Sequence, residues 1–162
     1  MIIAKKNTTK FRSNLQEKKV AKELGGRQVI GSGSLWGMSG DVRHEDILVE
    51  CKTTKEDYYS LTIETWLKIR NEAIKDGLRI PVMCIDLKHG KTRIAVFEDR
   101  AFNDHRDYYR YTPEETWWSI SWSLRIKAEY FFRCIFKQSN DLTLVLMPWE
   151  NFLKILKSEV TK

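Results

Sequence analysis

Residues 80–87, IPVMCIDL, form a nearly continuous apolar run, and no other feature limits the fold of this chain as strongly. A strand with one solvated face alternates apolar and polar residues, whereas this run is apolar at almost every position. We therefore predict a strand that is buried on both faces. A turn at KHGK (88–91) and a second apolar strand at TRIAVF (92–97) come next.

Helix and strand signals precede this strand in a regular order. A helix is predicted within 13–26, with a capping box of Ser13 and Gln16 at its start and two glycines at its end. A short strand at 27–30, a hairpin over 41–52 and a second helix within 60–77 follow it. This order predicts an α/β chain. The second helix is expected to turn four apolar side chains inward: Ile63, Trp66, Leu67 and Ile74.

The length of 162 residues suits one domain. We expect this single domain, 1–162, to have its core at 10–100 and an insertion or lid at 103–123. Closing strands and a helix are expected over 125–160, in RIKAEYFFRCIF, LTLVLM and PWENFLKILKSEV, with the helix begun by Pro148. Most of the aromatic residues lie in this later part, after residue 100.

The composition, 42% hydrophobic and 31% charged, is that of a globular protein. No stretch approaches the roughly 20 apolar residues of a membrane span, and the N-terminus has no signal-peptide pattern. Three widely spaced cysteines indicate buried thiols in a reducing cytoplasm instead of disulfides or a zinc site. The net charge of +6 favours a polyanionic partner, nucleic acid before a membrane.

The segment 31–40, GSGSLWGMSG, predicts a loop with four glycines. It lacks the Gly-Lys-Ser/Thr ending of a nucleotide-binding P-loop, and it precedes a strand instead of a helix, so ATP binding is a poor interpretation. A flexible loop that moves when a substrate arrives fits this composition better.

The stretch 40–54, GDVRHEDILVECKTT, predicts a hairpin that sets acidic residues together. If residues 45 and 46 make a two-residue turn, Asp41 faces Glu50 across the strands, where Cβ atoms are about 5 Å apart. Glu50 and Lys52 then point to one side of the sheet and Cys51 to the other. The plainer alternative is a surface hairpin with scattered charges.

A third acid, Glu17, lies on the inward face of the first helix, at helical spacing from Val20, Ala21 and Leu24. Its alternative place is the edge of that face, reaching water. Two like charges 4 Å apart repel by about 4 kcal/mol at an effective dielectric constant near 20.

A hard divalent cation offsets this repulsion, and oxygen ligands select Mg²⁺ or Mn²⁺ over zinc. We expect Asp41, Glu50, Glu17 and the backbone carbonyl of Cys51 as ligands. Lys52 would orient the attacking water or stabilise the charge that develops on a phosphate.

The order of helix Glu17, loop Asp41, and strand Glu50-x-Lys52 resembles the PD-(D/E)xK nuclease superfamily, and within it the Holliday junction resolvases of archaea and their phage-borne relatives. The similar segments also include GSGS, VECKTT and IPVMCIDL, and the resemblance covers residues 10–100. The resemblance implies a restriction-endonuclease-like core, a mixed β-sheet flanked by helices. It implies metal binding by Asp41 and Glu50, catalytic support by Lys52, and a metal or water contact by Glu17.

The resemblance also implies a loop serine near the scissile phosphate, either Ser32 or Ser34, and a homodimer on junction DNA. The chain departs from the family pattern in two ways. Gly40, not proline, precedes Asp41, and the aromatic-rich region after residue 100 extends beyond the similar part.

The leading hypothesis is a Mg²⁺-dependent endonuclease, with Mn²⁺ as a substitute, that cuts four-way junctions or other branched DNA. One alternative is the same chemistry on linear duplex or single-stranded DNA, and another is a non-catalytic DNA-binding module with a nuclease fold. The later aromatic residues would stack on unpaired bases, or they simply fill a core.

Overall fold

A computed structural model of the chain describes residues 9–30, 40–102, 118–120, 123–127, 132–136 and 142–160. The helices in these residues are α1 (Thr9–Leu24), α2 (Ile63–Lys75) and α3 (Trp149–Val160), with a short 3₁₀ turn at Lys88–Gly90. The strands are β1 (Arg27–Gln28), β2 (Val42–Arg43), β3 (Ile47–Thr53), β4 (Tyr58–Thr62), β5 (Ile80–Leu87), β6 (Thr92–Glu98), β7 (Trp118–Ile120), β8 (Ser123–Lys127), β9 (Phe132–Phe136) and β10 (Thr143–Pro148).

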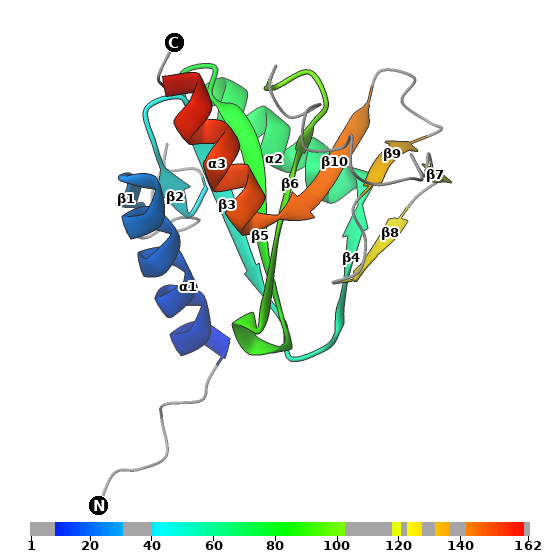
Figure 1. The fold of residues 1–162 in the computed structure, drawn as a ribbon, viewed down its shortest axis with the longest axis horizontal. Helices are drawn as coiled ribbons and strands as arrows, with labels where there is room; N and C mark the ends of the chain where they lie inside the picture. The colour runs from blue at the N-terminus through cyan, green and yellow to red at the C-terminus, as the bar shows by residue number, and fades with distance from the viewer. Residues whose placement is uncertain are drawn as a thin grey trace, which may run out of the picture.

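The chain has an α/β fold with a central mixed sheet flanked by helices (Figure 1). In the described residues the sheet has eight strands in the order β1-β2-β3-β5-β6-β10-β9-β7. β3 and β5 are parallel, as are β7 and β9, and the other pairs are antiparallel. α1 and α3 cover one face of the sheet, α2 covers the other, and β4 and β8 form a separate two-stranded sheet.

The prediction that residues 80–87 form a strand buried on both faces is confirmed. Met83 and Ile85 of β5 belong to the core beneath α2, whereas Val82 and Cys84 belong to the core beneath α1 and α3. This alternation is the period of two of a pleated strand, with a helix layer to meet each face. The strand predicted at 92–97 is β6.

The first helix ends where the sequence indicates and begins earlier. Gly25 follows its last residue with a φ of +66°, the left-handed conformation that favours glycine at a helix end. The helix begins at Thr9, however, so Ser13 and Gln16 lie inside it and the predicted capping box is wrong. Gln16 is instead 97% buried.

The region predicted as one helix within 60–77 contains a strand and then a helix. β4 ends at Thr62, whose Oγ1 accepts a hydrogen bond from the Thr65 amide and caps α2. The inward positions of Ile63 and Trp66 are confirmed. Ile74 is 46% exposed, so its inward assignment is wrong; the remaining buried positions of α2 are Ile69 and Ala73, and Leu67 is partly buried.

The later part of the chain joins the same sheet. β10 pairs with β6 on one side and β9 on the other, and α3 packs on the face that α1 covers. The single strand predicted at 125–136 is two strands in different sheets, because β8 pairs with β4. Of the insertion predicted at 103–123, residues 103–117 and 121–122 lie outside the described residues.

Two further expectations have partial outcomes. Cys51 and Cys84 are buried free thiols, and the side chain of Cys134 lies outside the described residues. Among the helices that the structure describes, none is long and apolar enough to cross a membrane.

Candidate active site

The hairpin that precedes the candidate site has the predicted register. Val42 lies opposite Val49, and His44 donates its amide hydrogen to Ile47 O at 2.9 Å, which closes a turn at residues 45–46. The same register sets Asp41 beside Glu50. β2 pairs with β3 only as far as Val49. In the described part of the chain, the edge of β3 from Glu50 onward is therefore not paired with β2, and Asp41 lies beside it.

Asp41 closes this edge with its own carboxylate. Its Oδ2 accepts a hydrogen bond of 2.7 Å from the Cys51 amide, and its own amide donates to Val49 O at 2.9 Å. The side chain therefore takes the place of a backbone partner for β3 and is fixed where the pairing of β2 and β3 ends.

Gly40 makes this geometry possible. It has a φ of +68°, and a Cβ atom there would lie 2.6 Å from Cγ of Leu48. Proline, whose φ is held near −65°, does not fit this conformation, which gives a physical reason for glycine at the position before Asp41.

Glu50 and Lys52 form the second part of the site. Lys52 Nζ lies 2.6 Å from Glu50 Oε1, and the Glu50 side chain is only 18% exposed. Burial raises the pKa of Glu50, and the charge of Asp41 raises it further, while Lys52 lowers it without cancelling the rise. Burial alone would lower the pKa of Lys52, but its contacts with Glu50 raise it, so this lysine stays charged.

Glu17 approaches the site from α1. Burial raises its pKa, the 2.6 Å hydrogen bond that Gln28 Nε2 donates to its Oε2 lowers it, and the charge of Asp41 raises it. The charge of Lys52 also lowers the pKa of Glu17. Glu17 therefore interacts electrostatically with Asp41 and Lys52, but its carboxylate already accepts a hydrogen bond from Gln28. A metal or water contact by Glu17 stays a prediction.

The donor set fits a cation that needs few protein ligands. Mg²⁺ is usually bound by one or two carboxylates and keeps several waters, and Asp41 and Glu50 supply two. In the described residues, no three His, Cys, Asp or Glu side chains form a cluster that could hold a metal ion. Burial raises the pKa of the Cys51 thiol well above its ordinary value, so the thiol stays protonated and only the backbone carbonyl is suited as a ligand.

Gln16 is a site residue that sequence reasoning missed. Its Nε2 donates to Lys52 O and to Cys84 O, each at 3.0 Å, and so ties α1 to both β3 and β5 beside the candidate site. A signal was present: Gln16 is four residues before Val20, on the inward face of the helix. The capping-box pattern hid it.

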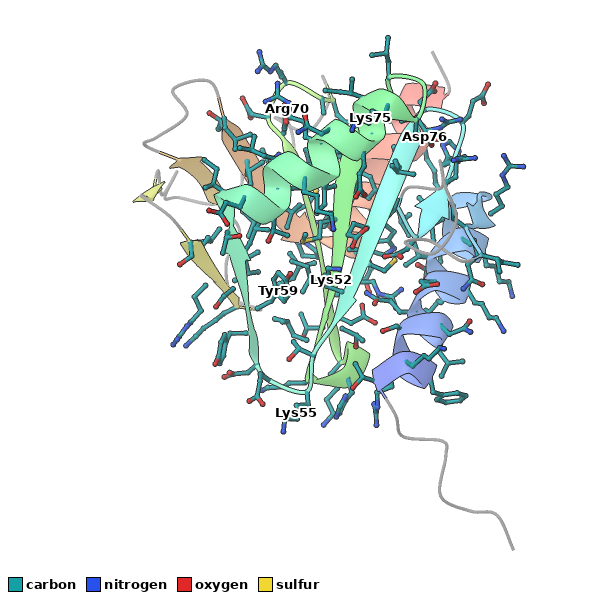
Figure 2. The ribbon with its side chains drawn as sticks, turned by 180° about the vertical axis from the view of Figure 1, so that it is seen from behind. Lys52, Lys55, Tyr59, Arg70, Lys75 and Asp76 are labelled. Atoms are coloured by element: carbon teal, nitrogen blue, oxygen red, sulfur yellow. The ribbon has the colours of Figure 1, made fainter. Side chains whose placement is uncertain are left out.

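Tyr59 of β4 is a second missed neighbour. Burial raises its pKa, the charge of Lys52 lowers it, and that of Glu50 raises it, so its hydroxyl interacts electrostatically with this pair. Figure 2 shows Tyr59 beside Lys52, between β4 and β3. Ser32 and Ser34, the predicted loop serines, lie outside the described residues.

Comparison with known proteins adds no assignment, since no family model matches the chain and no curated protein matches it significantly.

Proposed function

We propose that the chain is a metal-dependent endonuclease with a restriction-endonuclease-like core, and that it hydrolyses phosphodiesters of branched DNA, most concretely four-way junctions. The observation that carries this proposal is the convergence of Asp41, Glu50 and Lys52 at the point where the pairing of β2 with β3 ends. The site has more carboxylates than cations, and both Glu17 and Glu50 have raised pKa values.

Such an excess of negative charge repels a phosphate unless a cation is present. When bound, Mg²⁺ or Mn²⁺ would lower the pKa of a water molecule and neutralise part of the phosphate charge. The carboxylates of Asp41 and Glu50 would hold the cation, with the Cys51 backbone carbonyl as a further ligand. Because Lys52 stays charged and points to the same side as Glu50, it stabilises negative charge on the phosphate as it develops.

The choice of DNA rests on the net charge of +6, which favours a polyanion. The choice of branched DNA rests on the resemblance to junction resolvases. Two symmetric incisions across a junction need two active sites, so a homodimer belongs to the proposal, as does a cytoplasmic location.

The test is cleavage of an immobile four-way junction beside its linear duplex and single-stranded arms, at about 10 mM Mg²⁺ because such ions are weakly held. Lys52→Ala serves as the inactive control. Paired symmetric nicks in the junction alone are the expected result. Equal cutting of every substrate would retain the chemistry and reject the junction, and DNA binding without cutting by the wild type would favour a non-catalytic module.

A further inference from the structure

A polar hollow of about 560 Å³ lies just beyond the candidate active site. It is formed where the start of α1, the end of β3 and the turn between β5 and β6 meet. Its lining contains three threonines, two cationic side chains and an imidazole, and no carboxylate. These residues are Thr9, Arg12, Thr53, Thr54, Lys55 and His89.

This lining has the chemistry of a phosphate site. Hydroxyl, guanidinium, ammonium and imidazole groups all donate hydrogen bonds to phosphate oxygens. Two carboxylates lie beside the hollow: Asp86, opposite Thr53 in the sheet, is paired with Arg93 at 2.5 and 3.0 Å, and Glu56 lies 3.9 Å from Lys55 Nζ. Lys55 is 76% exposed in this long ion pair, so its charge stays available to an anion.

The walls of the hollow are held in place by backbone hydrogen bonds. His89 donates its amide hydrogen to Thr54 O and Lys88 donates to Glu56 O, both at 2.9 Å. Lys88 and His89 have φ values of +48° and +58°, and residues other than glycine rarely adopt such positive values. Such conformations persist only where the surrounding structure enforces them, and they often occur where ligands bind.

The hollow is also at a suitable distance from the catalytic residues. Thr53 directly follows Lys52 on β3, and along the strand its backbone is three residues, or about 10 Å, from that of Glu50, with the two side chains on opposite faces of the sheet. Each DNA strand carries one phosphate per 3.4 Å of helix axis. The backbone separation of the two places is about the length that three nucleotides span, so one DNA strand that passes the end of β3 is long enough to contact both.

We propose that this hollow, the flanking-phosphate pocket, binds a backbone phosphate of the DNA substrate and so sets which phosphodiester enters the active site. Phosphate contacts fix register without reading sequence. The proposal rests on the proposed function for its substrate, but phosphate binding itself does not depend on cleavage.

The chain offers a closely matched control for Lys55. Lys68 of α2 is 77% exposed and lies 4.0 Å from Glu72, almost the same environment as Lys55 beside Glu56. Both variants, Lys55→Ala and Lys68→Ala, remove one exposed positive charge from a weak pair. Only Lys55 lines the pocket. A second pocket variant is His89→Asn, because asparagine tolerates a positive φ.

DNA binding is measured by fluorescence anisotropy with a labelled junction and a labelled duplex, in EDTA, over a range of salt concentrations. Lys55→Ala is expected to weaken binding about tenfold and to reduce the salt slope by about one, because one phosphate contact is lost. Lys68→Ala should leave both unchanged. Equal losses for the two variants would overturn the proposal, since they would show a general charge effect.

Cleavage mapping and phosphate binding supply independent tests. In Mg²⁺, His89→Asn should shift or blur the cut position, and an unchanged position would count against the pocket. Inorganic phosphate, titrated into metal-free protein by NMR, should bind the wild type and bind Lys55→Ala several-fold more weakly. If the wild type binds DNA as expected but never cuts, the proposed function fails and the pocket stands. If it cuts while Lys55→Ala binds like Lys68→Ala, the pocket fails and the function stands.

Discussion

Two charged clusters of opposite character lie near the two ends of β3. At its start, Asp76 receives a bidentate pair from Arg43, with distances of 2.8 and 2.5 Å, and a 2.9 Å contact from Arg79. Toward its end, Asp41 and Glu50 share one lysine, Lys52. Figure 2 shows the separation, with Asp76 at the end of α2 and Lys52 well along the strand.

The difference separates charges that are balanced within the fold from charges that the fold leaves unbalanced. Two cations around Asp76 satisfy its carboxylate within the protein. At the other end burial and the neighbouring acid raise the pKa of Glu50, which means that the folded protein disfavours the charge it carries. A protein retains such a cluster at a cost in stability, and sites that bind a cation or perform chemistry are where that cost is commonly found.

The largest expected effect is on catalysis at the unbalanced end. Lys52→Ala should lower the cleavage rate by about 10² to 10³-fold, the usual cost of removing a group that stabilises transition-state charge. Binding of Mn²⁺ should persist, because the carboxylates remain. Single-turnover kinetics on the junction measure the rate, and a rate equal to that of the wild type would make Lys52 a purely structural residue.

The next effect concerns stability at the balanced end. Asp76→Ala should destabilise the fold by about 3 kcal/mol, since it leaves Arg43 and Arg79 partly buried without their shared acid. Thermal melting should fall by about 6 to 12 °C, and cleavage at a temperature where the variant is folded should be unchanged. Asp57→Ala, at an exposed acid, is the control and should change stability by less than about 0.5 kcal/mol. An equal effect of the two variants would contradict the assignment.

A smaller effect is expected on both the stability of the fold and the cleavage rate. Gly40→Ala should destabilise by about 2 kcal/mol, because alanine disfavours a positive φ and its Cβ would meet Leu48. Since Gly40 directly precedes Asp41, cleavage should fall as well. Gly25→Ala provides a comparison, because it has a similar φ of +66° and open space around it. It should cost less stability and leave the cleavage rate unaffected.

The smallest effect has the opposite sign. In metal-free protein at neutral pH, Glu50→Gln should raise stability by about 1 kcal/mol, because glutamine still accepts a hydrogen bond from Lys52 without the repulsion from Asp41. Because the pKa of the Glu50 carboxyl is raised, its negative charge destabilises the folded wild type. This destabilisation is absent below the ordinary pKa of 4.5 and develops as the pH rises through the raised pKa. Denaturant melts at several pH values would therefore show a gain only at the higher ones, and a loss there would contradict the interpretation.

Local patterns predicted the parts of the fold that depend on local physics. The apolar run 80–87 and the two-residue turn at 45–46 were enough to predict β5 and the register that brings Asp41 to Glu50, because a slip of one residue would reverse every side chain of the hairpin. Gly25 marked the end of α1 because the positive φ at a helix end is a local requirement that glycine meets.

The missed features depend on distant partners. β4 pairs with β8, more than sixty residues later in the chain, so its last residues, 60–62, were predicted as part of the second helix. β10 lies between β6 and β9, a position that no local pattern indicates. Gln16 fits a capping box and a buried amide equally well in sequence, and only the carbonyls of Lys52 and Cys84 decide between them.

Calorimetric titration of Mn²⁺ into metal-free protein tests most directly whether Asp41 and Glu50 bind a divalent cation. Wild type and the control Asp57→Asn, altered at an exposed acid, should bind the ion, whereas Asp41→Asn should lose most of the binding. Failure of the wild type to bind Mn²⁺ at millimolar concentration, or equal binding by Asp41→Asn, would contradict the account.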